Sequence, residues 1–421
     1  MRQLRLSAAR FARPFHVVLF TFAFFLLFTH GRYMDARQGP ACSTNSLRDP
    51  RNLYFPSALA IFVLVTRMIF RGPLYFGDGP DHIASIAAKT YVIQPPGYWL
   101  FDRIGGLFSD PVLAIAVMNI LFSVAGIVVF YYTASFFTGR VNAFLAAFAY
   151  STVFYIWFSG EIHSTYASQI LFPVATFYVL LSYERDRATW MLWLAALIFA
   201  VGAGLRPSDG VFIIPMAMYF AAFRMPRKEA FLFLSLILFF CLGWAIPTWL
   251  AFKNINSGAH GVRGVQTYVS HITTFQSIFT GFKMYTLANF VRYLLPLLVA
   301  FWPILGIAVL NAVHNRKDWR VKAMVIWIVP GSLFFVLVLI TNAPYLNFLT
   351  AAILLLAVST PRMMLVTALW NAIVFLGFGP IPSHNLAVNI VNSFVLRCTR
   401  GGIEQRFNAT LSQLQHLNNG L

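Results

Sequence analysis

Long apolar runs recur along almost the whole chain, and they constrain its fold more than any other feature. A run of ~20 apolar residues is long enough to cross a bilayer as a helix, in which every backbone polar group is bonded internally. Of the 421 residues, 59% are hydrophobic and 10% are charged, whereas soluble domains carry roughly 25% charged residues. The sequence therefore predicts an all-α polytopic membrane protein.

The runs correspond to about eleven predicted membrane spans. They cover residues 54–70, 111–133, 142–158, 165–182, 191–205, 210–223, 231–250, 292–312, 323–340, 347–359 and 363–378. Several are shorter than ~20 residues, so we expect some to be tilted or re-entrant. The predicted organisation is a transmembrane domain over residues 54–380 and a C-terminal tail over 381–421.

Residues 1–53 form a basic N-terminal segment with several possible interpretations. Arginines precede an apolar run at 15–29, as in a signal peptide. An interfacial amphipathic stretch, a mistaken start site and a true first span are the alternatives. The loop charges place residue 53 inside, which favours an interfacial or mis-started segment.

Basic loops alternate with loops that hold few cations, and this alternation predicts the orientation of the spans, because cytoplasmic loops are enriched in Lys and Arg. With Asp78 outside, the inside loops carry Arg140, Arg185, Arg187, Arg224, Arg227, Lys228, Arg316, Lys317, Arg320, Lys322 and Arg362. The net charge of +18 agrees with basic cytoplasmic loops and with an anionic lipid or phosphate partner. Nucleic acid is not an expected partner, since the cations are dispersed among the spans.

The stretch 77–98 stands out because acidic residues beside a membrane segment are costly and are often functional. The chain holds 13 Asp and Glu in all, and two of them, Asp78 and Asp81, directly follow the first predicted span. If Pro80 opens a short helix, Asp78 is its N-cap and Asp81 lies in its first turn. The two carboxylates then either carry a function or only cap this helix and complement its dipole.

The predicted orientation brings polar residues from separate loops to the same outer face. They are Asp78, Asp81, Gln94, Glu161, His163, Arg206 and Asp209. The orientation rests on the cations of the inside loops, so this gathering is an independent observation. It indicates a site.

The motifs in these loops resemble those of a known family. They are Gly77-Asp78-Gly79-Pro80-Asp81, Gln94-Pro95-Pro96-Gly97-Tyr98, Asn119 in the next span and Glu161-Ile162-His163. Over about residues 55–215 the chain resembles the bacterial and animal relatives of protein O-mannosyltransferases. More broadly, it resembles the GT-C superfamily of polyprenyl-phosphate-sugar-dependent glycosyltransferases. That family carries motifs like G-D-S-x-E, H-P-P-G-Y-P and E-V-Y in this order.

The chain departs from the family pattern at several positions. Asp81 stands where Glu is usual, and Gln94 stands where His is common. Trp99 replaces a proline, and His163 replaces the aromatic residue of the E-V-Y-like motif. The exchange at Gln94 removes the imidazole that precedes Pro-Pro-Gly in the family.

The resemblance implies that a sugar passes from a polyprenyl-phosphate donor to an acceptor at the outer face, with inversion of the anomeric centre. It implies Asp78 as the base, because a carboxylate at the membrane surface can take the proton of an attacking hydroxyl. Asp81 is expected to orient the acceptor or assist the base. Arg206 is expected to stabilise the leaving phosphate. The other expected substrate-binding residues are Gln94, Tyr98, Glu161 and His163.

Each assignment has a structural alternative. Arg206 can be an interface anchor paired with Asp209, and Glu161 can be a structural partner of His163 or Lys89. Asn119 is expected to join helices. Interfacial aromatic belts explain Tyr98, Trp99 and Trp157 as well as a sugar groove does. Further phosphate contacts are expected among the cations in or beside the long outer loop, which are Lys253, Arg263, Lys283 and Arg292.

We expect no cofactor and no metal ion, with the lipid-linked sugar as a substrate. A divalent ion held by Asp78, Asp81 and His82 is the alternative. The cysteines, Cys42, Cys241 and Cys398, are too scattered for a disulfide framework or a metal cluster. The expected partners are a polyprenyl-phosphate sugar, an acceptor protein, lipid or glycan, and membrane lipids. The expected location is a bacterial plasma (inner) membrane.

A transporter or flippase for an anionic lipid or sugar is the alternative function. It predicts a polar pathway at mid-membrane depth and internal symmetry. The charges of this chain lie instead at the ends of the predicted spans, and its halves show no repeat. A non-catalytic scaffold would need neither the acidic loop at Asp78 and Asp81 nor the Pro-Pro-Gly turn. The sequence therefore favours a membrane-surface enzyme.

Overall fold

The elements of the chain are helices, as the apolar runs predict. The computed structural model describes residues 53–69, 79–91, 98–255, 285–337, 343–380 and 386–405, and all of these belong to one unit, residues 47–421. Within these ranges the elements are α-helices and short 3-10 helices, without a strand. The all-α prediction is confirmed for this part of the chain. Residues 1–52 lie outside it, so the status of the N-terminal segment stays a prediction.

Each predicted run coincides with one helix or with a bent pair of helices. The longer helices are α2 (Tyr54–Ile69), α5 (Pro111–Ala134), α6 (Arg140–Thr152), α8 (Ser168–Asp186), α9 (Trp190–Leu205), α10 (Pro207–Phe223), α11 (Arg227–Ile255), α14 (Tyr285–Phe301), α15 (Leu305–His314), α16 (Trp319–Leu337), α17 (Asn347–Leu356) and α18 (Pro361–Gly377). The short elements are α3 (Gly79–Ala87), α4 (Trp99–Gly105), α7 (Phe154–Glu161), α19 (Leu386–Phe394), η3 (Thr165–Ala167), η4 (Ala343–Leu346) and η5 (Leu396–Cys398).

Fewer helices than the predicted eleven spans meet the length and composition expected of a membrane-crossing helix. In the described chain, 4 helices are long and apolar enough to cross a membrane, or up to 6 if each bent pair forms one span. The bent pairs are α6 with α7, at 62°, and α14 with α15, at 97°. Other apolar helices, such as α2, α9 and α10, are shorter. The count of eleven therefore stays a prediction.

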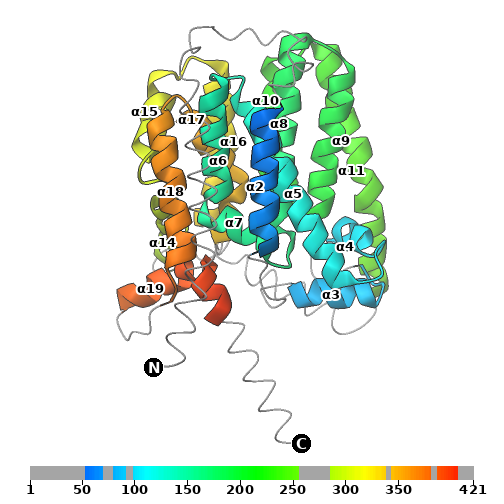
Figure 1. Cartoon of the computed structure of the whole chain (residues 1–421). Helices are drawn as coiled ribbons and strands as arrows, with labels where there is room; N and C mark the ends of the chain where they lie inside the picture. The colour runs from blue at the N-terminus through cyan, green and yellow to red at the C-terminus, as the bar shows by residue number, and fades with distance from the viewer. Residues whose placement is uncertain are drawn as a thin grey trace, which may run out of the picture. The chain divides into compact units, whose positions relative to one another are not determined.

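The long helices run side by side, and α3, α4, α7 and α19 gather near one end of them (Figure 1). Ring contacts at the opposite end join the start of α2 to the end of α5 and to the start of α6. Phe55 lies 6.4 Å from Tyr131 and 5.1 Å from Phe144, centroid to centroid. The chain therefore starts α2 at the end where Arg140 lies, and it reaches α3 at the other end.

Local sequence explains where α5 begins and how closely it packs against α8. The side chain of Asp110 accepts hydrogen bonds from the backbone N–H groups of Val112 (2.8 Å) and Leu113 (3.2 Å), which caps α5. Gly126 brings α5 against α8, because a Cβ there would lie 2.6 Å from the carbonyl oxygen of Ile170. Such close approach needs glycine.

The run predicted as one straight span at 142–158 is broken. Helix α6 ends at Thr152, and α7 starts at Phe154 after Val153, whose ψ of 122° is not helical. The N–H of Phe154, which the break frees, donates to the side-chain oxygen of Asn371 on α18 (3.2 Å). The break carries α7 as far as Glu161, so Glu161 belongs to a helix and not to the predicted outer loop.

An apolar cluster fixes α3 and α4 on the bundle. Ile86 of α3 and Phe101 of α4 pack against residues of α5, α8 and α9, which are Ile115, Met118, Phe172 and Leu205. All of these side chains are buried. The short helices that flank the acidic stretch therefore have a firm base on the long ones.

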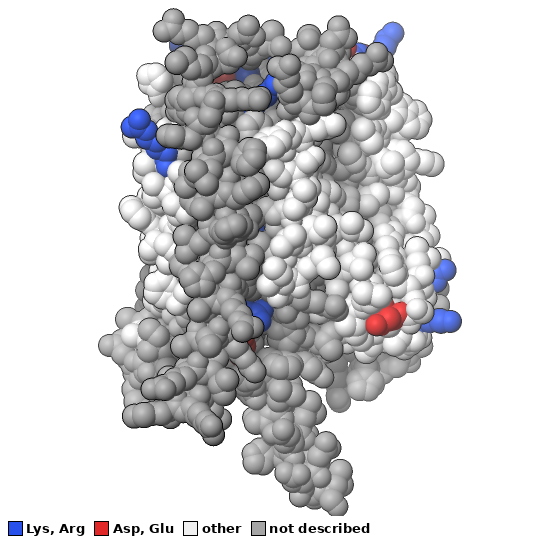
Figure 2. All heavy atoms as spheres, in the orientation of Figure 1, with Lys and Arg blue, Asp and Glu red and all other residues white. Residues whose placement is uncertain are grey.

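The flank of the helix bundle is apolar. On the face drawn in Figure 2, the described side chains along the flank are mostly uncharged, and most visible charges lie toward the ends. Large apolar side chains are exposed there, among them Leu121 of α5 and Phe231, Phe239 and Trp249 of α11. Exposed apolar area on this scale is typical of a surface that contacts lipid.

The described part of the predicted C-terminal tail is helical. It contains α19, η5 and a further helical stretch at 400–405. A Cβ at Gly401 would lie 2.7 Å from the Cα of Gly379, so two glycines bring this segment against the end of α18, backbone to backbone. Arg400 also lies close enough for its charge to act on Glu161 of α7.

Candidate functional site

The predicted acidic helix is present, and Asp81 is exposed on it. Helix α3 starts at Gly79, with Asp81 in its first turn. Asp78 and Gln94 lie outside the described residues, so their predicted roles remain predictions. An exposed carboxylate in the first turn is stabilised by the helix dipole and is open to a substrate. The position of Asp81 therefore fits both interpretations of the acidic stretch, a functional carboxylate and one that only complements the helix dipole.

A buried histidine–carboxylate pair joins α3 to α4. Nδ1 of His82 lies 2.6 Å from Oδ1 of Asp102, and both side chains are buried. This bond needs one proton between the two atoms, which the Nδ1–H tautomer of the imidazole would donate to a carboxylate. The rings of Tyr98 and Phe101 each lie 5.1 Å from the imidazole, edge to face. This pair ties the acidic helix to the predicted substrate residue Tyr98.

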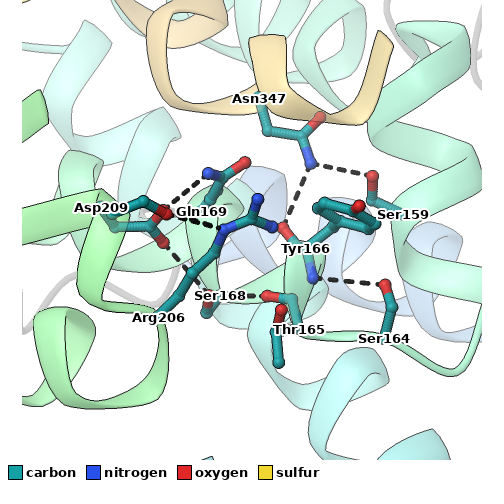
Figure 3. A network of polar contacts seen from close by, with 10 residues as sticks. Ser159, Ser164, Thr165, Tyr166, Ser168, Gln169, Arg206, Asp209 and Asn347 are labelled. Atoms are coloured by element: carbon teal, nitrogen blue, oxygen red, sulfur yellow. Dashed lines mark hydrogen bonds and ion pairs between the residues drawn. The ribbon is translucent and has the colours of Figure 1, made fainter. Parts of the chain in front are cut away.

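Arg206 and Asp209 form the predicted ion pair, but inside the protein rather than at an interface. Nε of Arg206 lies 3.4 Å from Oδ1 of Asp209, and the two side chains are 5% and 0% exposed. The side chain of Gln169 donates to Oδ1 of Asp209 (2.6 Å), and Ser168 donates to Oδ2 (3.4 Å). Figure 3 shows these contacts around the carboxylate. Asp209 is thus held from α8 as well as by Arg206.

Two tyrosines flank the Arg206 guanidinium. Its carbon lies 4.3 Å from the ring centroid of Tyr166 and 5.0 Å from that of Tyr345, distances typical of cation–π contacts. Burial lowers the pKa of Arg206, but nearby charges, with Asp209 first among them, raise this pKa by more, so it lies above its usual value. Within the described chain, Nη1 has no hydrogen-bond partner. A permanent cation with an unused N–H is suited to bind an anion.

Asn347 links the tyrosine-bearing segments. Its amide donates to the hydroxyl of Ser159 on α7 (2.8 Å) and to the carbonyl oxygen of Tyr166 (3.1 Å). Figure 3 shows this link beside the Arg206 network. Asn347 directly follows η4, the element that carries Tyr345. The positions of both aromatic faces are therefore coupled.

Glu161 lies buried at the end of α7. Its Oε1 accepts a hydrogen bond from Nε1 of Trp157 (2.5 Å), and its side chain is 3% exposed. The charges of Arg67 and Arg400 act on it. Arg67 lies at the end of α2, fully buried, with its guanidinium 5.0 Å from the Trp157 ring centroid. This carboxylate therefore lies inside the protein, in a positively charged environment.

The residue after Glu161 is tied to α5. Asn119 donates to the carbonyl oxygen of Ile162 (2.6 Å), which agrees with its predicted role in joining helices. His163 follows and is also buried. The motif Glu161-Ile162-His163 is thus fixed in place.

The structure brings most of the described candidates to one end of the bundle. Tyr98 connects them, because its ring contacts that of His82 and it lies close enough to Arg206 to help raise the pKa of the guanidinium, after Asp209. Of the cations in or beside the long outer loop, only Arg292 lies where side chains are described, and it is half-buried in α14. The other three are not tested.

Several residues of the site were not predicted from the sequence. They are Arg67, Asp102, Tyr166, Gln169, Tyr345 and Asn347. A cation or an acid inside an apolar segment is a usable signal, and it marks Arg67 and Asp102. The tyrosines and amides carry no such signal, since they are common at membrane interfaces.

A metal site is not supported among the described residues. They contain no group of three or more His, Cys, Asp or Glu side chains that could hold an ion. The alternative site at Asp78, Asp81 and His82 includes a residue outside the described ranges, so it is not tested. The known partner of His82 is Asp102.

Comparison with known proteins gives one family. Residues 94–249 match the model of the dolichyl-phosphate-mannose-protein mannosyltransferases. The match contains Tyr98, Glu161, His163 and Arg206 with its buried network, whereas Asp78 and Asp81 precede it. No curated protein and no solved structure gives a significant match. From α4 to α11 the chain is therefore similar to the dolichyl-phosphate-mannose-protein mannosyltransferases, and the resemblance predicted from its motifs is confirmed.

Proposed function

We propose that this protein is an integral membrane glycosyltransferase that transfers a sugar from a polyprenyl-phosphate donor to an acceptor hydroxyl. The family match supports a membrane glycosyltransferase of the mannosyltransferase type. The observation that carries the proposal is the buried Arg206, with an unused N–H, between two tyrosine faces.

The proposed reaction divides the work between two groups. Asp78 takes the proton of the acceptor hydroxyl as its oxygen attacks the anomeric carbon, and the bond from that carbon to the donor phosphate breaks with inversion. The negative charge that develops on the phosphate is stabilised by Arg206. A phosphate leaves without needing a proton, so a second carboxylic acid is not required. Asp81, exposed on α3, is placed to orient the acceptor.

The Arg206 guanidinium suits a phosphate monoanion better than a sugar. A guanidinium presents several N–H donors in one plane, which matches phosphate oxygens. Asp209 uses the Nε side of the guanidinium, so Nη1 stays available within the described chain. The tyrosine faces exclude water, which strengthens the interaction with a bound anion.

We place the reaction at the outer face of a bacterial plasma membrane. The support for this face is the distribution of cations between the two ends of the helices.

The test is transfer of radiolabelled sugar from a panel of polyprenyl-phosphate sugars, with membranes that contain the wild type or Asp78→Asn. Asparagine caps a helix about as well as aspartate. If Asp78 only caps α3, the variant therefore keeps its activity. If Asp78 is the base, the variant loses at least ~100-fold in rate. Asp110→Asn is the matched control, since Asp110 is an exposed acid that caps α5, and it should retain full activity.

Two outcomes contradict parts of the proposal. Full activity of Asp78→Asn would move the base to Asp81 or Glu161. If the wild type consumes no donor across a broad panel of donors and acceptors, the enzyme proposal fails. Lipid flipping in reconstituted vesicles then becomes the next measurement.

A further inference from the structure

Arg67 is a cation to which the proposed reaction gives no role. It lies in the last turn of the apolar helix α2, and its side chain is fully buried. It precedes the residues that match the family model, so that comparison assigns nothing to it. A charge inside a membrane segment is costly and is often functional. Its surroundings indicate what it does.

Arg67 contacts both parts of the bent pair α6 and α7, and Figure 1 shows α7 beside the end of α2. Its Nη2 donates to the carbonyl oxygen of Ser151 (2.8 Å), in the last turn of α6. The last carbonyl oxygens of a helix lack a partner within it, and they attract a cation. On the other side of the break, the guanidinium carbon lies 5.0 Å from the ring centroid of Trp157 in α7. One side chain of α2 therefore bridges the break.

The same contacts bring Arg67 to Glu161. Trp157, which faces the guanidinium, donates its indole N–H to Oε1 of Glu161 (2.5 Å). A Cβ on Gly160 would lie 2.7 Å from Nε of Arg67, so the guanidinium packs directly on the backbone that precedes Glu161. The charges of Arg67 and Glu161 also act on each other. The two side chains are therefore neighbours, held together through Trp157 and the backbone of α7.

Each of the two residues needs the charge of the other. Arginine keeps its charge in proteins, so Arg67 buried without an anion would be strongly destabilising. Glu161 is 3% exposed and is the last residue of α7, where the helix dipole disfavours a carboxylate. A nearby cation offsets both costs. Among the cations that act on Glu161, Arg67 has the larger effect, and Arg400 of the C-terminal segment adds to it.

We propose that Arg67 is the counter-charge of Glu161, and that it holds this carboxylate in place at the end of the α6–α7 bend. Arg67 is then a positioning residue for the site, because it acts through Glu161. Only the effect on sugar transfer rests on the proposed function, since the charge pair itself does not.

The direct test is a double-variant cycle on the melting temperature of the purified full-length protein in detergent. Arg67→Met leaves a buried anion without its counter-charge, so the melting temperature should fall by several degrees. Glu161→Gln removes the anion but keeps an oxygen that accepts from Trp157. When Arg67→Met is added to Glu161→Gln, it removes a cation that has lost its anion, so the melting temperature should fall far less or rise.

The cycle gives an answer even if one variant does not fold. If Arg67→Met folds only together with Glu161→Gln, the pair is supported, because removal of both charges restores what removal of one destroys. If Arg67→Met lowers the melting temperature equally with and without Glu161→Gln, or fails to fold in both cases, the proposal is overturned.

Arg320→Met is the matched control. Arg320 also donates to a backbone carbonyl oxygen, that of Phe136 (3.4 Å), and its guanidinium carbon lies 5.8 Å from the ring centroid of Phe137. It lies at the start of α16, far from Glu161 in the bundle. Arg320→Met should therefore have the same effect with and without Glu161→Gln. If its effect depends on Glu161→Gln as much as that of Arg67→Met does, the coupling is a general effect of charge and the proposal fails.

The transfer assay adds a readout that a purely structural role would not move. If Arg67 acts through Glu161, Arg67→Met and Glu161→Gln each lower kcat by up to ~100-fold. The double variant should lose no more than the poorer single variant, because residues that act as a unit are not additive. Arg67→Lys keeps the charge and should recover part of the loss.

The two proposals fail separately in these experiments. Losses that multiply in the double variant, or unchanged transfer in Arg67→Met, would overturn the positioning role while the enzyme proposal stands. If the wild type transfers no sugar, the enzyme proposal fails, and the melting cycle alone decides whether Arg67 is the counter-charge of Glu161.

Discussion

At the scale of single residues, the least expected feature is how Arg206 is held. Its charge is balanced by Asp209, three residues on, and that pair is visible in the sequence. Its aromatic contacts come from Tyr166 and Tyr345, far apart in the chain. Asn347 joins these segments by donating to Ser159 and to the backbone of Tyr166. Because these contacts span distant parts of the chain, nothing in the local sequence indicates that the segments meet. Arg206 can therefore pair with Asp209 and also bind a phosphate, so the two interpretations of this residue are compatible.

The buried Arg206–Asp209 pair predicts that loss of Arg206 lowers both protein stability and donor binding. A double variant separates these two effects. Arg206→Met leaves Asp209 buried without its counter-charge, which costs about 3–5 kcal/mol. Arg206→Met combined with Asp209→Asn removes both charges and should recover most of that loss. Neither variant should bind the donor. Thermal melts in detergent and donor KM values check this, and normal donor affinity in the double variant would exclude Arg206 as the phosphate contact.

The His82–Asp102 pair predicts that a buried bond, rather than the exposed acid beside it, holds α3. Asp102→Asn weakens the charge-assisted bond to His82 and leaves the imidazole poorly paired, at a cost of about 1–3 kcal/mol. Asp81→Asn changes an exposed carboxylate on the same helix and should leave the melting temperature unchanged. Equal melting of both variants and the wild type would show that the pair adds nothing.

At the scale of elements, the positions of the helices followed from the sequence, but the breaks in them did not. An apolar run predicts a helix because its backbone N–H and C=O groups must bond to one another away from water, and this need does not depend on distant contacts. The run through 142–158 stays apolar across Val153, so the bend of 62° leaves no trace in it. The group that stabilises the bend is Asn371, whose distance in sequence is 217 residues. The burial of Glu161 depends on that bend and was missed for the same reason.

This dependence predicts the effect of removing the Asn371 side chain. Besides accepting from Phe154, Asn371 donates to the carbonyl oxygens of Ala300 (2.8 Å) and Thr367 (2.9 Å). Asn371→Leu leaves the N–H of Phe154 buried without a partner, so we expect a loss of about 1–3 kcal/mol in the free energy of unfolding. Transfer activity should fall too, because α7 carries Glu161.

A control separates this effect from the loss of any asparagine. Asn142 lies at the start of α6 and, among the described residues, bonds locally to Thr138 (3.1 Å). Asn142→Ala should therefore unfold at nearly the wild-type denaturant concentration. Similar losses in the two variants would contradict a special role for the bend.

At the scale of the whole described unit, the sequence predicted that the candidate residues lie at one end, and the structure agrees for those it describes. Asp81, Tyr98, Glu161 and Arg206 lie at the end where α3, α4 and α7 gather (Figure 1). Arg140, Arg187 and Arg224 lie at the other, at the ends of α6, α8 and α10. Loop charge predicts such a division because it sets the direction of insertion. The spans themselves are harder to count, since length alone does not reveal which short helices cross the bilayer.

Single cysteines at the two ends test the orientation directly. With Cys42, Cys241 and Cys398 replaced by alanine, Ala88→Cys places an exposed thiol just after α3, and Gly139→Cys places one just before α6. A membrane-impermeant maleimide should label Ala88→Cys in intact spheroplasts and label Gly139→Cys only after the membrane is opened. The reverse pattern would place Asp81 and Arg206 in the cytoplasm. A sugar donor on the outer leaflet could then not reach them, so the proposed reaction would have to occur at the inner face.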